Sequence, residues 1–171
     1  MNFNDLEKFN FTLYKQPNFV LIKLAYTDPL TGCYNRNMLE EMRDTLDRQD
    51  LIVTIVDVDG LKMINDHHGH HAGDILIQKV ANQLKFFSEL VFRLGGDEFL
   101  LIDRQPHSIN LGVIDHISFG CYLKTDQSLS FAMQMADEAM YKMKNQRKEM
   151  LKSYVNEGFG IENAQTRNSS E

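Results

Sequence analysis

The sequence lacks the features that define several specialised classes of protein. It has only two cysteines among 171 residues, so it offers no disulfide framework of the kind found in small secreted proteins. Its start has no basic segment followed by a long apolar core, and its apolar runs are too short to span a membrane. The net charge of −6 argues against a nucleic-acid partner or an anionic membrane. We therefore expect a cytoplasmic globular protein without a membrane span.

The most informative stretch present is the segment from Arg93 to Phe99, in which two glycines precede two acids. Apolar residues flank it on both sides, a pattern typical of two strands joined by a tight turn. Gly95 and Gly96 give the turn its backbone freedom. The adjacent carboxylates of Asp97 and Glu98 repel each other unless a cation lies near them. The turn is therefore either a solvated tip or a metal site at which a nucleotide can approach the backbone.

A second acidic stretch favours the metal site. Apolar residues 51–56 indicate a buried strand, which runs directly into Asp57 and Asp59. The C-terminal edge of a strand is where α/β folds bind ligands. If the hairpin tip lies beside this edge, Asp57 and Asp97 converge, with Glu98 as a further candidate. Such oxygen ligands suit Mg²⁺ or Mn²⁺ better than zinc. An EF-hand does not fit, because its remaining ligand positions and central glycine are absent.

Five motifs, in order along the chain, resemble those of the GGDEF domain of diguanylate cyclases and cover roughly residues 24 to 150. They are Asp28-Pro29-Leu30-Thr31-Gly32 with Asn35-Arg36; residues 57–66 with Gly69-His70 and Gly73-Asp74; the Gly95–Phe99 turn; Ser118-Phe119-Gly120; and Ala136-Asp137 with Tyr141 and Lys144. The resemblance implies an α/β (α+β) fold like the palm of nucleotidyl cyclases and polymerases, with a central, mostly antiparallel sheet flanked by helices. It also implies that two GTP molecules are condensed into cyclic di-GMP, with release of two pyrophosphates, by a homodimer.

The resemblance assigns the metal and the catalytic chemistry to a few residues. Asp57 and Asp97, with the carbonyl of Val58, would hold Mg²⁺ or Mn²⁺. Glu98 would be a further ligand or would help to deprotonate the attacking hydroxyl. Lys62 is counted among the catalytic residues. It lies at the start of a short helix, where its ammonium and the free backbone N–H groups can bind a phosphate together. The remaining phosphate contacts are expected from Gly60, Leu61, Gly95, Gly96, Lys144 and Lys148.

Asn65 and Asp74 would read the guanine base. An amide oxygen and a carboxylate can accept from guanine N1–H and its N2 amine, and the Asn amide can donate to N3. Alone, Asn65 would be interpreted as a helix cap. The four histidines at positions 67, 68, 70 and 71 suggest zinc or nickel when taken by themselves. However, His70 matches a family histidine that is not a metal ligand, so we do not expect a transition-metal site.

Three departures from the family pattern stand out. The usual inhibitory product site, Arg-x-x-Asp, reads Phe86 to Glu89 here, so its phosphate-binding arginine is absent. After Lys144, Lys148 takes the position at which the family has an arginine, and Arg147 lies one residue earlier. Because one residue turns a helix by about 100°, Arg147 and Lys148 cannot both be equivalent to that arginine. The connection over residues 103–116 is too short for the family's helix, so one face of the sheet should lack its usual cover.

We divide the chain into a helical segment over residues 1–24, a GGDEF domain over 25–155 and a disordered tail over 156–171. Residues 3–24 are expected to pack on the domain. Apolar periodicity predicts helices over 36–48, 61–67, 72–87 and 130–154, and strands over 51–58 and 113–123 besides the hairpin. The predicted core stripes are Met38, Leu39, Met42 and Leu46; Ile75, Leu76, Val80, Ala81 and Leu84; and Phe131, Met135, Ala139 and Met143. The alternatives are a catalytically degenerate GTP-binding module, a synthase of another cyclic dinucleotide, or a scaffold without a nucleotide.

Overall fold

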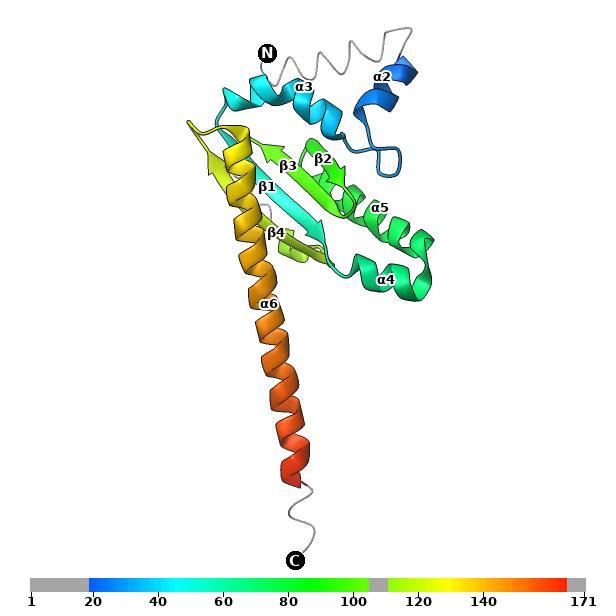
Figure 1. Ribbon diagram of the computed structural model, residues 1–171, viewed down its shortest axis with the longest axis vertical. Coiled ribbons are helices and arrows are strands. Elements are labelled where there is room, and N and C mark those ends of the chain that lie inside the picture. Colours follow the sequence, from blue (N-terminus) through cyan, green and yellow to red (C-terminus); the bar gives the residue numbers. More distant parts are fainter. Residues whose placement is uncertain (1–18, 105–110, 166–171) are drawn as a thin grey trace, which may run out of the picture.

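The protein is built around a four-stranded antiparallel sheet with the strand order β2-β3-β1-β4. The structure is a computed structural model that describes residues 19–104 and 111–165 (Figure 1). The strands are β1 (Leu51–Val58), β2 (Leu90–Gly95), β3 (Glu98–Asp103) and β4 (Ile117–Lys124). β1 is central and pairs with β3 on one side and β4 on the other. No helix among the described residues is long and apolar enough to cross a membrane.

One face of the sheet is covered by α3 (Arg36–Asp47) and the first part of α6 (Leu129–Gln165). Asn35 caps α3, because its side-chain oxygen accepts a hydrogen bond from the Met38 N–H at 3.2 Å. The helix buries Met38, Leu39, Met42 and Leu46, the stripe that the periodicity predicts. Lys124 is also fully buried at the end of β4, and its ammonium donates to the carbonyls of Asp47 and Gln49, which close the end of α3.

The other face is covered by α4 (Leu61–His68) and α5 (His70–Phe87), which meet at Gly69. α5 buries Leu76, Ile77, Val80, Ala81 and Leu84. The prediction that Ile75 is buried is wrong, since its side chain is 52% exposed. Buried positions repeat every three or four residues from Gly73, and one residue turns a helix by about 100°, so Ile75 falls outside this stripe and Ile77 inside it.

The predicted buried face of α6 is wrong by about one residue. Leu129, Ala132, Ala136 and Met140 are buried, whereas Phe131 is 44% exposed. A Cβ atom on Gly120 of β4 would lie 2.2 Å from the Ala136 carbonyl oxygen, so the helix backbone touches the strand there. Such close contact places small side chains against the sheet in place of the large ones.

α6 continues far beyond the sheet (Figure 1). The helix extends to Gln165 and so includes residues 156–165 of the expected tail, and residues 166–171 lie outside the described part.

The shortened connection leaves part of the sheet open, as expected. Its described part forms a 3-10 turn, η1 (Leu111–Val113), and buries Leu111 and Ile114 beside α5. This turn takes the place of the first residues predicted for the strand, so β4 begins at Ile117 and not at Val113. Register with β1 puts Cys121 and Leu123 on the same face, where both are exposed, Leu123 by 62%.

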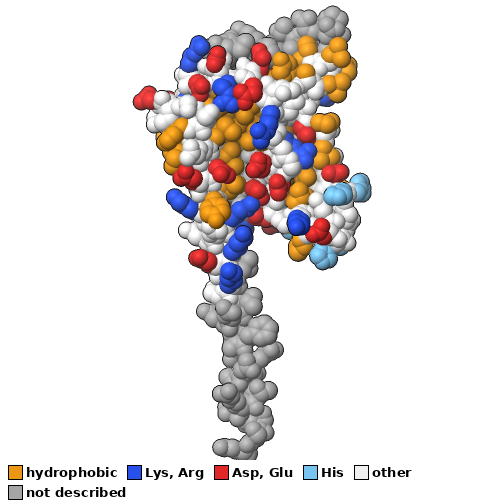
Figure 2. Space-filling view, in the orientation of Figure 1, with side chains coloured by type: hydrophobic (Ala, Val, Ile, Leu, Met, Phe, Trp, Pro, Cys, Tyr) orange, Lys and Arg blue, Asp and Glu red, His pale blue; other side chains and the backbone are white. Residues whose placement is uncertain are grey.

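α2 (Phe19–Tyr26) lies beside α3 but keeps apolar side chains in solvent. Val20, Leu21 and Leu24 are each about two-thirds exposed, at 66%, 65% and 67%. Figure 2 shows hydrophobic side chains grouped at the upper right, over α2. The end of α2 is held by hydrogen bonds from Asn35 and Asn37 to the Ala25 carbonyl, and Tyr26 packs partly buried against the core cluster that includes the buried residues of α3. The expected packing of residues 3–24 is therefore wrong for these three side chains; residues 1–18 lie outside the described part.

Candidate functional site

The hairpin tip lies beside the C-terminal end of β1, as expected. β3 pairs with β1 so that Glu98 stands opposite Asp57. The Val58 N–H then donates to the Asp97 carbonyl at 3.0 Å, which extends the pairing into the turn. Gly60 follows with a φ of 77°, a left-handed conformation that favours glycine, and the chain turns there from β1 into α4. The two acidic stretches of the sequence therefore meet at one edge of the sheet.

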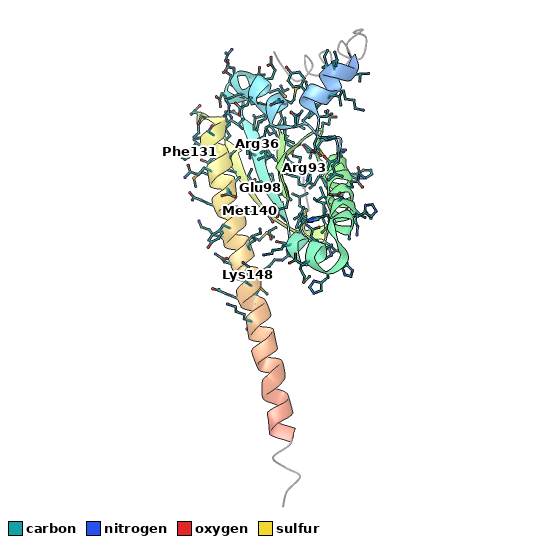
Figure 3. All side chains as sticks on the ribbon, turned by 45° about the vertical axis from the view of Figure 1, so that its right-hand side comes forward. Arg36, Arg93, Glu98, Phe131, Met140 and Lys148 are labelled. Atoms are coloured by element: carbon teal, nitrogen blue, oxygen red, sulfur yellow. The ribbon has the colours of Figure 1, made fainter. Side chains whose placement is uncertain are left out.

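Two arginines donate hydrogen bonds to the backbone of the hairpin tip. Arg93 donates to the Gly96 carbonyl at 2.7 and 3.1 Å and to both oxygens of Asp28 at 3.1 and 3.2 Å. Arg36 donates to the Leu94 carbonyl, and both arginines lie beside the hairpin in Figure 3. Burial favours a higher pKa for Asp28, but hydrogen bonds from Thr31 and Arg93 bring this pKa below its usual value. The segment from Asp28 to Arg36 and the hairpin therefore stabilise each other.

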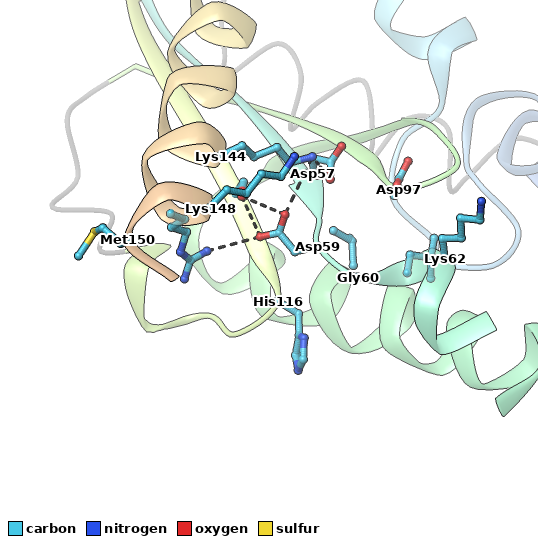
Figure 4. A pocket seen from close by; sticks show the side chains of 13 residues that line it. Asp57, Asp59, Gly60, Lys62, Asp97, His116, Lys144, Lys148 and Met150 are labelled. Atoms are coloured by element: carbon cyan, nitrogen blue, oxygen red, sulfur yellow. Dashed lines mark hydrogen bonds and ion pairs between the residues drawn. The ribbon is translucent and has the colours of Figure 1, made fainter. Parts of the chain in front are cut away.

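A pocket of about 800 Å³ opens between the edge of the sheet, the start of α4 and α6 (Figure 4). This volume is in the range of small-molecule sites. Figure 2 shows acidic and basic side chains next to each other where α6 leaves the body of the molecule. Of the residues predicted for the site, those that line the pocket are Asp57, Val58, Gly60, Leu61, Lys62, Asp97, Lys144 and Lys148.

Within the pocket, Lys144 of α6 forms an ion pair with Asp57. Its Nζ lies 2.6 Å from Asp57 Oδ1. Burial raises the pKa of Asp57; the hydrogen bond and charge of Lys144 act in the opposite direction, and the charges of Asp97 and Asp59 raise it further. The ammonium of Lys144 therefore compensates part of a carboxylate cluster that is unfavourable by itself.

A second acidic group, Asp59, connects α6 to β4. Its carboxylate accepts from Ser118 Oγ at 2.8 and 3.0 Å and lies 3.4 Å from an Arg147 nitrogen. The same Arg147 nitrogen donates to the Ile117 carbonyl at 2.7 Å. The sequence pattern predicts no role for Asp59 and leaves that of Arg147 open. For Arg147 a signal is present in its spacing, because it follows Lys144 by three residues and so lies on the same helix face.

The two residues predicted to read the base lie outside the pocket lining, on neighbouring helices. Asn65 belongs to α4, and Asp74 is exposed near the start of α5. Gly73, directly before Asp74, packs against the Asn65 side chain. The Asn65 side-chain oxygen is buried without a hydrogen-bond partner. A buried acceptor without a donor is unfavourable, so no hydrogen bond of this oxygen stabilises the contact between α4 and α5.

Comparison with known proteins identifies the family. The sequence model described as "Diguanylate cyclase, GGDEF domain" matches residues 25–111. The chain belongs to the GGDEF family. It is 37% identical over 97 residues to the diguanylate cyclase DgcP of Escherichia coli K12, a match covering 52% of this chain and 28% of DgcP. It is 32% identical over 165 residues to the diguanylate cyclase DgcN of the same organism, covering 78% of this chain and 40% of DgcN. The chain thus spans between about a quarter and two fifths of these relatives.

Solved GGDEF structures have the same fold. A sensory box/GGDEF family protein from Caulobacter crescentus CB15 is 30% identical, with a TM-score of 0.59, and the match covers 71% of this chain and 99% of that one. The palm-like α/β fold expected for the GGDEF domain is therefore confirmed, with its antiparallel sheet and flanking helices.

The donors at the sheet edge of this GGDEF domain fit a hard divalent cation. Asp97 is close enough to Asp57 for its charge to raise the pKa of Asp57. Among the described residues no three His, Cys, Asp or Glu side chains form a ready-made metal cluster. Mg²⁺ keeps several waters and typically takes one or two carboxylates plus substrate phosphates. The residues present therefore fit a cation whose coordination the substrate completes.

Proposed function

We propose that this chain is a diguanylate cyclase, which condenses two GTP molecules into cyclic di-GMP and releases two pyrophosphates. The observation that best supports this proposal is the pocket in which Asp57 and Asp97 face the basic side chains of α6. Carboxylates for a metal and ammonium groups for phosphates are the two kinds of group that phosphoryl transfer requires. In this pocket both kinds lie at the edge of one sheet.

The basic residues bind the triphosphate. Lys144 pairs with Asp57 without substrate and exchanges this partner for a phosphate oxygen when GTP enters. Lys148 and Lys62 line the same pocket and bind phosphate from its two sides. The backbone N–H groups at Gly60 and Leu61, where α4 begins, and the glycines of the hairpin tip, Gly95 and Gly96, allow the phosphates to approach the chain.

The acids prepare the reaction. Asp57, Asp97 and the Val58 carbonyl hold Mg²⁺ or Mn²⁺, which when bound neutralises charge on the phosphates. Glu98, opposite Asp57 on the neighbouring strand, assists there or accepts the proton of the attacking 3′-hydroxyl. Asp74 and Asn65 select guanine through the edge that adenine lacks.

The reaction needs two copies of the chain. Each subunit holds one GTP, and the 3′-hydroxyl of each GTP attacks the α-phosphorus of the other. A single pocket cannot bring both reacting centres together, so a homodimer is required at least during turnover. A cytoplasmic location with free access to GTP belongs to the same proposal.

The decisive experiment is incubation of the purified protein with GTP and Mg²⁺, with the products identified by mass. We expect cyclic di-GMP and pyrophosphate, and no product from ATP. Asp97→Ala is the matched control, because it removes one carboxylate from the hairpin tip. Tight GTP binding without product would instead favour the degenerate binding module, and a product from ATP would favour a synthase of another cyclic dinucleotide.

A further inference from the structure

Gly73 is in direct contact with the carboxamide of Asn65. A Cβ atom built on this buried glycine would lie 2.0 Å from Asn65 Oδ1 and 2.9 Å from its Cγ. The next nearest atom is a terminal methyl of Leu61, at 3.0 Å. Any side chain at position 73 would therefore meet the carboxamide first and displace it.

This contact also orients the carboxamide. Its oxygen is buried against the Gly73 backbone and has no hydrogen-bond partner. A carbonyl oxygen can accept a weak Cα–H contact at such a place, whereas an NH₂ group there would press its hydrogens against the glycine hydrogens. Asn65 as a whole is half-buried. Its side-chain nitrogen has no hydrogen-bond partner among the described residues, yet it is not one of the buried atoms without a partner, so it is exposed to solvent. The NH₂ end is thus the end that a ligand can reach.

We infer that Gly73 is a positioning residue for base recognition, which holds the Asn65 carboxamide with its oxygen inward and its NH₂ outward. This inference rests on the proposed function and divides the recognition between two side chains. Asn65 donates to an acceptor of guanine, and Asp74, next to Gly73 on α5, accepts from the N1–H and N2 donor edge. Asn65 therefore does not contribute an acceptor, although its chemistry allows one.

The test uses 3′-deoxy-GTP and 3′-deoxy-ATP with Mg²⁺, because without a 3′-hydroxyl neither can be condensed. Binding is measured by titration calorimetry. Gly73→Ala should weaken 3′-deoxy-GTP binding about tenfold, the equivalent of one lost hydrogen bond, and reduce its advantage over 3′-deoxy-ATP. Lys79→Ala, an exposed substitution on the same helix, is the matched control and should bind both as wild type does.

A double-mutant cycle separates positioning from simple damage to the fold. Because the added methyl acts through the Asn65 carboxamide, Gly73→Ala combined with Asn65→Ala should bind 3′-deoxy-GTP within about twofold of Asn65→Ala alone. Asn65→Asp should lose at least as much affinity as Asn65→Ala, since it removes the donor and keeps the acceptor.

Three results would overturn the inference while leaving the proposed function intact. They are wild-type affinity and selectivity in Gly73→Ala, losses that multiply in the double variant, and wild-type affinity in Asn65→Asp. Wild-type protein that binds neither nucleotide, or binds both equally, would overturn the proposed function and this inference together.

Discussion

Replacing Lys144 by methionine should strengthen the binding of a divalent cation while weakening the binding of nucleotide. Lys144 Nζ lies 2.6 Å from Asp57 Oδ1, and the two side chains are only 26% and 16% exposed. A divalent cation bound by Asp57 would therefore compete with this ammonium for the same carboxylate. Methionine keeps most of the apolar stem and removes only this charge.

The structure sets the size of the effect. Exposed ion pairs contribute up to about 1 kcal/mol, and this pair, short and mostly shielded, belongs at the upper end of that range. A metal that reaches Asp57 must displace the lysine, so without it Mn²⁺ should bind the nucleotide-free protein about fivefold more tightly. Binding of 3′-deoxy-GTP should weaken tenfold or more, because a charged hydrogen bond to phosphate is lost, which costs about 1.5–3 kcal/mol.

The assay is a titration of nucleotide-free protein with Mn²⁺, followed by electron paramagnetic resonance of the free ion. Lys148→Met is the matched control, because Lys148 lines the same pocket and its substitution removes one positive charge from the same helix. No ion pair of Lys148 is found among the described residues, so only the general field should change there. Mn²⁺ affinity in Lys144→Met no greater than in Lys148→Met would refute the view that Lys144 competes with a divalent cation for Asp57.

Four further outcomes follow from the site. Asp97→Ala should abolish product formation in a GTP turnover assay yet still melt cooperatively; near-normal turnover would remove Asp97 from the metal site. Asp74→Ser should lose the preference for GTP over ATP in a competition scored by product mass, and unchanged exclusion of ATP would contradict its role. Asp28→Asn should lower the stability by about 1–2 kcal/mol at pH 7, since Arg93 and Thr31 donate to this carboxylate. The pKa of Asp28 in the folded protein is below the ordinary value of 3.8 for an aspartate. This contribution is therefore present above pH 3.8 and is lost as the pH falls through the lowered pKa, so denaturant curves of variant and wild type should converge in acid. Added cyclic di-GMP should inhibit turnover weakly, because Phe86 stands where a phosphate-binding arginine is expected, and strong noncompetitive inhibition in progress curves would point to another product site.

Local signals explain which parts of the fold could be predicted from the sequence. α3 combines a capping Asn35 with a clean helical period, and neither depends on the rest of the chain. The meeting of the two acidic stretches also follows from simple topology, because the antiparallel pairing of β1 with β3 puts Glu98 opposite Asp57. The first feature depends only on neighbouring residues, and the second depends on a single strand pairing.

The face of α6 depended on a residue far away in the sequence. Apolar periodicity predicts Phe131, Met135, Ala139 and Met143 on the buried face, but Gly120 brings the helix backbone against β4 beside Ala136, and the residues buried in this part of the helix are Ala132 and Ala136. Phe131 then moves to the border, where its ring meets that of Tyr122 edge to face. The ion pair of Lys144 with Asp57 could not be predicted for the same reason, since it depends on how the helix is rotated on the sheet.

This rotation connects the core of the protein to its candidate site. The buried stripe of α6 runs through Ala136 and Met140, and the same helix face continues at Lys144 and Arg147, four and then three residues further on. Where the sheet ends, the stripe changes from apolar to basic and meets Asp57 and Asp59 at the end of β1. The close contact at Gly120 therefore does more than fill the core: it sets the register in which the basic residues of α6 face the acids of the sheet edge. A GGDEF domain that approached α6 less closely at this point would keep its two acidic motifs together but would direct its lysine elsewhere.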